Sequence, residues 1–255
     1  MKTTYKYLSL VLVALLIALL LAGCWNLNLS RFGVKSIKPS NVIITEERDV
    51  SGFSAIDFST FGKMIIAQGD SESLTIKGSD NIVPLVQTSV SNGVLIIKME
   101  KKVSIVGLTP ENVLTFTISV KDLTSLDVSG AGDFEMDSLD TTDLAIDMSG
   151  AGRIAFNDLT AESLTLDLSG AGGVELAGEV TKATIDLSGA GGVDAPDLKI
   201  QTAEVNISGL GGATIWVTDQ LTGEISGAGG VSYYGNPQTD TSVSGLGNFK
   251  NLGEK

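Results

Sequence analysis

The chain has no histidine, and its 255 residues include a single cysteine and only five prolines. Without histidine, Ser-His-Asp groups, Cys-His groups and His-ligated metal sites are all excluded. One cysteine cannot form a disulfide within the chain. Aromatic residues are also scarce, at 5% of the chain, whereas glycine is abundant, at 30 residues. This composition argues against an ordinary mixed core and against an enzyme.

Basic residues are few as well, with 17 Lys and Arg against 30 Asp and Glu, which gives a formal net charge of −13. Such an acidic surface repels phosphate backbones and anionic lipid headgroups. We therefore expect no binding to nucleic acid, and we expect the folded part to be held off the membrane rather than to lie flat on it.

A long apolar run occurs at the start, from Tyr7 to Leu21, behind the basic residues Lys2 and Lys6. The run is shorter than the roughly 20 residues that a spanning helix needs. Its layout is typical of a secretory signal peptide, which predicts that residues 1–23 are removed. An uncleaved membrane anchor is the alternative.

The small residues after this run, "LAGC", resemble the bacterial lipobox, and Cys24 stands where that motif has its lipid-bearing residue. The resemblance implies a thioether-linked diacylglycerol on Cys24 together with an N-acyl chain such as palmitate. Two or three acyl chains hold a protein firmly on a bilayer. The expectation is a chain exported across the cytoplasmic membrane and anchored to an envelope membrane, outside the cytoplasm. Residues 24–45, which include Pro39, read as a tether that passes into a first strand.

One motif, Ser-Gly-x-Gly, recurs at intervals of 18 to 20 residues. Its copies begin at Ser129, Ser149, Ser169, Ser188, Ser208, Ser226 and Ser244. A fixed period of this length indicates a repeat architecture. The glycines suit the close approach of stacked backbones or a positive φ, and the small serine hydroxyl suits a local hydrogen bond at a corner.

The letters before each motif alternate apolar and polar, as in Leu164, Leu166 and Leu168, which is the period of a strand with one buried face. A second apolar pair follows each Gly-x-Gly, and a third apolar point comes a few residues later. No repeat can bury these faces alone, whereas stacked repeats bury all of them. The sequence predicts an all-β fold, a parallel β-helix or β-solenoid with coils of about 18–20 residues. A leucine-rich repeat and a propeller or sandwich fit less well, because the Asn or Cys ladder, the longer blade repeat and the regular hairpin turns that they need are missing.

The less regular stretch from Ser51 to Val128 is assigned to the same structure. Its "IDFSTFG" keeps the Ile, Asp, Ser and final Gly of the later "IDLSGAG", with Thr60 and Phe61 in place of Gly and Ala. Terminal coils of a solenoid are expected to be atypical because they blunt an open edge. We therefore predict a single domain over residues 46–255.

An acidic residue stands two places before most of the repeated serines. The column reads Asp127, Asp147, Asp167, Asp186, Asn206, Glu224 and Ser242. Charges ~4.8 Å apart in a parallel stack repel by about 0.9 kcal/mol in water and about 3.5 kcal/mol at an effective dielectric constant of about 20. Ca²⁺ or a cationic ligand along the column is one interpretation, since hard cations take carboxylate oxygens. Hydrated, splayed carboxylates that discourage aggregation are the other.

Other candidate sites are weaker. The serines have no general base at regular spacing, and Arg153 is an isolated base beside an acidic row, so no catalytic residue is assigned. Trp216, Tyr233 and Tyr234 form either a sugar-stacking platform or a cap on the end of the core.

The sequence resembles the putative auto-transporter adhesin, head-GIN domain family of bacterial envelope proteins. The likeness lies in "GFSAIDFSTFGKMIIAQGD", "SVSNGVLIIK", the serial "SGAG" and "SGLG" motifs, and "YYGNP" at residues 233–237. It extends from about Val50 to Phe249. The resemblance implies a right-handed parallel β-helix exposed at the cell surface, and it supplies no catalytic residues.

These observations together predict a membrane-anchored, non-enzymatic lipoprotein that acts as an adhesin-like binding or scaffold module. A ladder of similar groups would bind a repetitive glycan or envelope polymer through many weak contacts. One alternative is a regulatory or sensory envelope lipoprotein that binds a partner protein. Another is a carbohydrate-active enzyme, since β-helices also carry lyases and hydrolases.

Overall fold

A computed structural model describes residues 35–255, which divide into two compact units. The smaller unit contains β1 (Lys35–Ile37) and β8 (Val103–Ile105), which pair in parallel, with Lys35 opposite Val103. The main-chain N–H of Lys35 donates to the carbonyl oxygen of Lys102 at 2.8 Å. The predicted signal peptide, Cys24 and residues 24–34 of the predicted tether lie outside the described residues.

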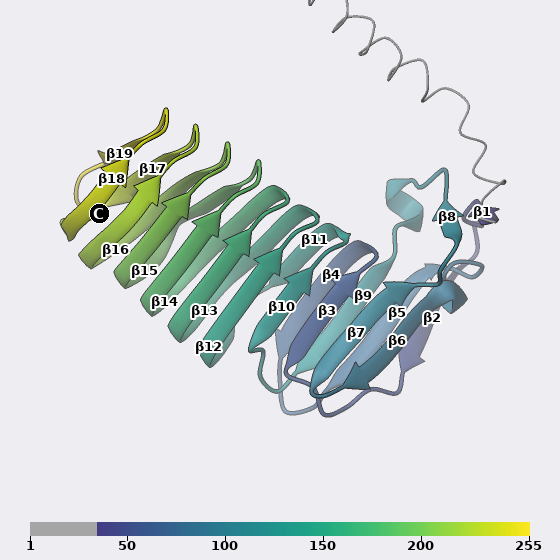
Figure 1. Cartoon of the computed structure of the whole chain (residues 1–255). Helices are drawn as coiled ribbons and strands as arrows, with labels where there is room; N and C mark the ends of the chain where they lie inside the picture. The colour runs from purple at the N-terminus through teal and green to yellow at the C-terminus, as the bar shows by residue number, and fades with distance from the viewer. Residues whose placement is uncertain (1–34) are drawn as a thin grey trace, which may run out of the picture. The chain divides into compact units, whose positions relative to one another are not determined.

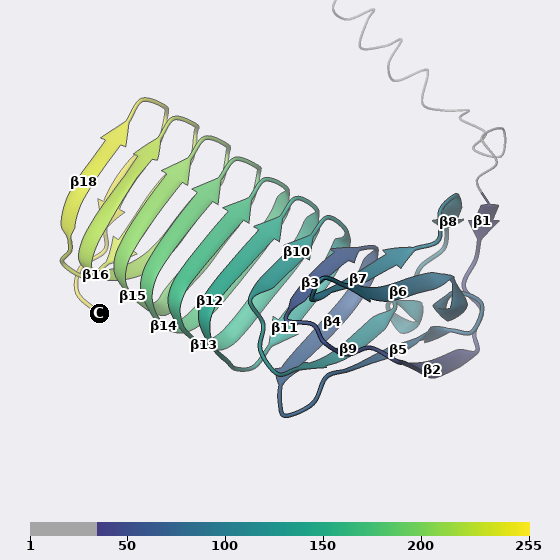
Figure 2. The same cartoon turned by 60° about the horizontal axis from the view of Figure 1, so that its bottom comes forward.

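The larger unit, residues 39–100 and 107–255, contains the repeats (Figure 1). Their strands run in parallel and stack coil on coil, which confirms the predicted β-solenoid (Figure 2). The strands are β10 (Ser125–Val128), β11 (Ala131–Met136), β12 (Leu139–Met148), β13 (Ala151–Leu168), β14 (Ala171–Leu187), β15 (Gly192–Ile207), β16 (Gly212–Ile225), β17 (Gly230–Tyr234), β18 (Gln238–Val243) and β19 (Asn248–Asn251).

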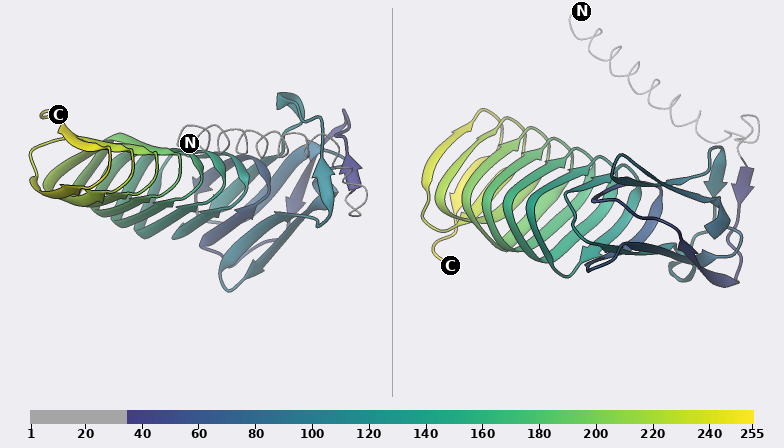
Figure 3. Two further views of the ribbon diagram at one scale, coloured as in Figure 1. Left: turned by 45° about the horizontal axis from the view of Figure 1, so that its top comes forward. Right: turned by 90° about the horizontal axis from the view of Figure 1, so that it is seen from below.

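Each coil contains three segments with buried apolar residues, called its three faces below, and Figure 3 shows the stacked coils from two further sides. The first face ends at the Ser-Gly corner, the second begins after it, and the third is a short segment that leads to the next coil. In the coil of β13 the first, second and third faces contain Leu168, Phe156 and Leu159 respectively, each at most 2% exposed. The inward positions predicted by the alternation are buried throughout, apart from Tyr233, which is half-buried. Period-two patterning thus builds one continuous apolar core.

The Ser-Gly corners are held by backbone hydrogen bonds between successive coils. At one corner the N–H of Gly150 donates to the oxygen of Val128 at 2.9 Å, and the N–H of Ala151 donates to the oxygen of Gly130 at 3.0 Å. A Cβ on Gly150 would lie 1.9 Å from the oxygen of Gly130, so the predicted close approach of backbones is confirmed. The predicted hydrogen bond of the serine hydroxyl stays a prediction, while the backbone N–H groups at these corners bond to the preceding coil.

The first part of the larger unit extends the stack and then departs from it. Its elements are β2 (Ile43–Arg48), β3 (Ala55–Ser59), β4 (Phe61–Gln68), β5 (Ser73–Ser79), the 3-10 turn η3 (Val83–Leu85), β6 (Val86–Ser91), β7 (Val94–Met99), the 3-10 turn η4 (Pro110–Asn112) and β9 (Thr115–Val120). Strands β3 and β4 pair in parallel with β10 and β11, as the likeness of "IDFSTFG" predicts. Strand pairs β2–β5, β5–β9 and β6–β7 are antiparallel, an arrangement that differs from the predicted parallel coils.

The β6–β7 hairpin has an identifiable cause. Asn92 and Gly93 have φ values of 52° and 80°, the pair of positive values that a two-residue type I′ turn requires. Such a turn reverses the chain and cannot continue a coil. The hairpin therefore ends the parallel order at this end of the unit.

A group of three rings links this part to the coils. Phe58 on β3 is fully buried and packs edge-to-face against Phe116 and Phe134, with ring centroids 5.3 and 5.1 Å apart. Edge-to-face packing of this kind adds about 0.5–1.5 kcal/mol beyond the buried area.

The coil of β18 and β19 forms the opposite end of the stack. Strand β18 is exposed along its length, and its inward positions include Thr239 and Thr241, opposite Leu221 and Gly223 of β16. Hydroxyl side chains here replace the apolar ones of earlier coils, as expected for an atypical terminal coil.

Candidate functional site

The predicted acidic column exists and is one residue longer than expected. Asp127, Asp147, Asp167 and Asp186 are direct register partners on successive coils. Asp57 on β3 pairs with Asp127 and adds a further carboxylate. The acidic column, as used below, is Asp57, Asp127, Asp147, Asp167, Asp186, Asn206, Glu224 and Ser242.

Like charges in the acidic column change its titration. Desolvation against the sheet raises the pKa of Asp127, and the carboxylates of Asp147 and Asp57 raise it further. The pKa of Asp167 is raised in the same way, first by desolvation and then by Asp147 and Asp186. Farther along the column, the uncharged Asn206 interrupts the repulsion between carboxylates, and its Nδ2 donates to Oδ1 of Asp186 at 3.0 Å.

The raised pKa values predict a pH effect on stability. Protons bind Asp127 and Asp167 more tightly in the folded chain than in the unfolded chain, so their stabilising contribution is complete below the ordinary carboxyl range. It is lost as pH rises through the raised pKa values. Asp147→Asn removes the charged neighbour that these two carboxyls share, and we expect it to stabilise the chain at pH 7.5. We expect a gain of a few tenths of a kcal/mol, because solvent screens such exposed groups.

Urea unfolding at pH 7.5 and at pH 4 measures this effect, with the gain shrinking at the lower pH. Asp143→Asn is the matched control, because Asp143 lies on the same strand opposite Ser163 and outside the acidic column. Equal shifts for the two variants would contradict an origin in carboxylate repulsion.

Metal binding by the acidic column finds no geometric support. Among residues 35–255, no group of three or more acidic, histidine or cysteine side chains is arranged to hold a metal ion. The carboxylates form a single file, whereas Ca²⁺ takes six to eight converging oxygens. Calcium binding along the acidic column stays a prediction, and residues 35–255 offer no group of side chains arranged to hold the ion.

On the second face, charged side chains of opposite sign pair between coils. Nε and a terminal nitrogen of Arg153 donate to the two carboxylate oxygens of Glu175 at 2.6 and 2.5 Å, and Arg153 lies 3.9 Å from Glu135. Lys63 pairs with Glu135 at 2.8 Å. The hydrogen bond from Arg153 lowers the pKa of Glu175, and the pKa of Arg153 is raised in turn. Arg153 is thus part of an ion-pair ladder between coils, which gives it a structural task.

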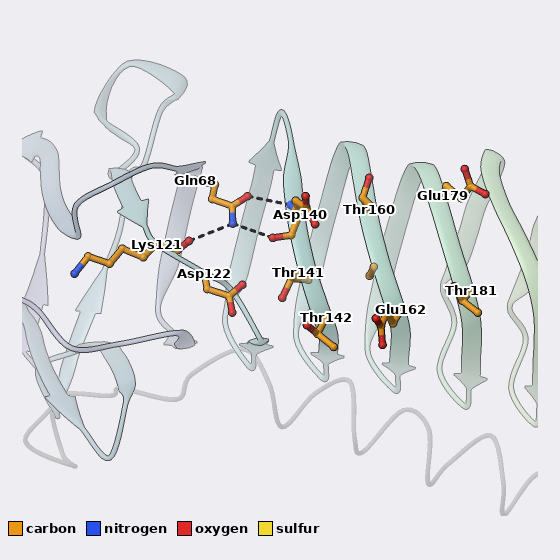
Figure 4. A pocket seen from close by; sticks show the side chains of 11 residues that line it. Gln68, Lys121, Asp122, Asp140, Thr141, Thr142, Thr160, Glu162, Glu179 and Thr181 are labelled. Carbon is orange, nitrogen blue, oxygen red and sulfur yellow. Dashed lines mark hydrogen bonds between the residues drawn. The ribbon is translucent and has the colours of Figure 1, made fainter.

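A polar groove of about 670 Å³ lies along the third face and was not predicted from the sequence (Figure 4). Its lining comes from the end of β4, from the segment before β10, and from the third face of three successive coils. We call it the coil groove, lined by Gln68, Lys121, Asp122, Asp140, Thr141, Thr142, Thr160, Ala161, Glu162, Glu179 and Thr181. It contains four carboxylates and one lysine, so it is anionic.

Register explains why the coil groove is periodic. Asp140, Thr160 and Glu179 are direct partners on β12, β13 and β14, so each coil contributes one polar side chain at the same level. Parallel coils repeat at about 4.8 Å. A linear ligand along the coil groove therefore meets hydroxyl and carboxylate groups at a regular interval.

The start of the coil groove is fixed by Gln68. Its Oε1 accepts from the N–H of Asp140 at 2.9 Å, and its Nε2 donates to the carbonyl oxygens of Asp140 at 2.9 Å and Lys121 at 3.2 Å (Figure 4). The side-chain amide therefore substitutes for a neighbouring strand at this end of β12. Two other lining atoms, Oδ1 of Asp122 and Oγ1 of Thr141, are shielded from solvent and have no hydrogen-bond partner among the described residues. Buried polar atoms are normally paired, so these two oxygens are exceptions beside the coil groove.

The aromatic residues singled out in the sequence are divided by the strand pattern. Trp216 and Tyr234 are direct partners on β16 and β17. Tyr233 pairs with the buried Ile215 and so belongs to the inward row. Trp216 and Tyr234 thus form a two-ring surface, while Tyr233 covers the end of the core.

Together these features define a class: an all-β solenoid whose coils present polar groups in regular columns and along one groove. A family model described as "Putative auto-transporter adhesin, head GIN domain" matches residues 52–237. The chain belongs to this family.

Solved structures support the same fold. A putative adhesin from Bacteroides fragilis is 29% identical, with a TM-score of 0.81 over 85% of this chain and all of that one. A putative lipid binding protein from Parabacteroides distasonis is 22% identical, with a TM-score of 0.71 over 86% of this chain and all of that one. A putative adhesin from the same species is 18% identical, with a TM-score of 0.66 over 86% and all of the two chains. The search among curated proteins gives no match. Within residues 35–255, no helix is long and apolar enough to cross a membrane.

Proposed function

We propose that this chain is a non-enzymatic, adhesin-like module that binds a repetitive envelope polymer, such as a glycan, along the coil groove. The observation that carries the proposal is the coil groove itself, whose hydroxyl and carboxylate lining repeats in register from coil to coil. Family membership supports an adhesin-like role. Sugar hydroxyls both donate and accept hydrogen bonds, which suits this mixed lining.

Affinity in such a groove comes from repetition. Each coil offers a few weak hydrogen bonds, and once one unit of a polymer is bound, the next is held at a high effective concentration. The excess of carboxylates in the coil groove disfavours anionic polymers. We therefore expect neutral or cationic polysaccharides to bind in preference to acidic ones.

A pair of arginine substitutions tests the coil groove. Thr160→Arg places a long cation in the middle of the groove and is expected to reduce binding to polysaccharide at least tenfold, whereas Thr165→Arg on the first face should leave it unchanged. The readout is retention of the full chain on beads carrying dextran, chitosan or alginate, with dextran or chitosan preferred. Equal retention of both variants, or a preference for alginate, would contradict the proposal. If a membrane protein co-purifies with the chain and Thr160→Arg does not affect it, the result would favour the regulatory alternative.

We also propose that the chain is a lipoprotein held on an envelope membrane through Cys24, with the solenoid outside the cytoplasm. The support is the apolar run, the "LAGC" motif that ends in the chain's single cysteine, and membership in an adhesin family. A lipid anchor and a tether would present the coil groove away from the bilayer.

A further inference from the structure

The two-ring surface of Trp216 and Tyr234 is occupied by a cation from the chain itself. The ammonium nitrogen of Lys255 lies 5.4 Å from the centroid of the Trp216 ring and 5.6 Å from that of the Tyr234 ring. Both distances are within the ~6 Å at which a cation is attracted to an aromatic face. The two rings therefore contact the charged ammonium group of Lys255.

Two oxygen acceptors complete the site from the neighbouring coil. Lys255 donates to the carbonyl oxygen of Pro196 and to Oδ1 of Asp197, both on β15. The Pro196 carbonyl is free for this because the register between β15 and β16 shifts between Ala195 and Lys199, which leaves residues 196–198 without partners on β16. The Lys255 side chain is only 29% exposed, so its stem is largely covered.

We propose that Trp216, Tyr234, Asp197 and the Pro196 carbonyl form a binding site for a primary alkylammonium group, and that Lys255 is its intramolecular occupant. Two ring faces, a carboxylate and a carbonyl match an ammonium that keeps N–H donors while its alkyl stem lies on apolar surface. A quaternary ammonium has no N–H to donate and fits less well. A carboxylate or phosphate is repelled by Asp197.

This site is independent of the coil groove and of the function proposed for it. None of its four residues lines the groove, whose residues end at Thr181, before the start of β15. The external ligand must displace Lys255, which competes at the effective concentration of a tethered group. Free polyamines and lysine side chains both carry the required group, and the experiment separates them.

The test uses the full chain with Trp25→Phe, which leaves Trp216 as the single tryptophan and its indole N–H as a single NMR signal. Butylammonium is titrated into this protein and into the same protein with Lys255→Gln. We expect the Trp216 signal to shift in both, with affinity about fivefold to tenfold higher for Lys255→Gln because the tethered competitor is gone. Cadaverine and N-acetyl-lysine methylamide are the two further probes, and the tighter binder identifies a free polyamine or a peptide as the source.

Three controls make the outcome decisive. Lys250→Gln removes an equal charge from β19 and should bind as the parent does. Asp197→Asn added to Lys255→Gln should weaken binding several-fold while the circular dichroism spectrum stays that of the folded chain. Butanol should give no saturable shift. A shift with butanol, equal binding of tetramethylammonium, or no shift with butylammonium would each overturn the proposal.

Discussion

Gly170→Ala is expected to destabilise the folded chain by about 3 kcal/mol or more, or to prevent folding. A Cβ at this position would lie 2.0 Å from the carbonyl oxygen of Gly150 and 2.7 Å from backbone atoms of Ser149. These atoms belong to the preceding coil and are fixed by the ladder, so the coils themselves would have to separate. Because each coil contacts only its neighbours, a gap in the middle of the stack uncouples the two sides. Denaturant unfolding followed by circular dichroism measures the loss.

Gly173→Ala is the matched control. It lies three residues away, and a Cβ there would meet no atom within 4 Å. Alanine should be neutral or slightly stabilising, because it reduces the entropy of the unfolded chain. If both variants lose the same stability, close approach of backbones is not what the repeated glycine provides.

Cys24→Ser is expected to move the protein almost completely from the membrane fraction to the soluble fraction of the envelope. The reason is that the proposed lipid chains on the cysteine supply most of the membrane affinity, at about 0.8 kcal/mol for each buried CH₂. Fractionation and immunoblotting of cells that express the full chain measure the change. Asn26→Ser, two residues later, is the control and should stay with the membrane. Retention of Cys24→Ser in the membrane would instead indicate an uncleaved anchor.

The coils could be predicted because their determinants are local. Alternation places Leu164, Leu166 and Leu168 on one side of a strand, and a period near 20 residues brings equivalent positions into register. The same alternation and period predict the acidic column. Asp57 is absent from the predicted column because the column follows the Ser-Gly-x-Gly copies, and Thr60 interrupts that motif even though "IDFSTFG" aligns with the later "IDLSGAG".

What could not be predicted depends on contacts between distant segments. The turn at Asn92 and Gly93 accounts for the β6–β7 hairpin alone. The antiparallel pairs β2–β5 and β5–β9 join segments that lie tens of residues apart, such as Ser73 and Ser119. The coil groove joins Gln68 to Asp140, 72 residues later. The threonines and acidic residues that recur on the third face were a sequence signal for the coil groove. The prediction used only the apolar residue that lies among them.

The candidate residues also changed roles once their surroundings were known. Arg153, considered as a base beside an acidic row, lies on another face and binds Glu175 and Glu135. Of the three aromatic residues, two share an outward surface and Tyr233 does not. Which residue faces which neighbour depends on register shifts such as the one after Ala195, and alternation alone does not locate them.

The central claim is that stacked coils form one periodic groove that binds a polymer through repeated weak contacts. The most direct measurement is the affinity of the full chain for dextran and chitosan oligomers of increasing length, by calorimetry. We expect affinity to rise steeply with each added sugar until the oligomer spans the coil groove and then to level off, with Thr160→Arg abolishing the rise. An affinity that is independent of length, or undetectable for both series, would contradict the account.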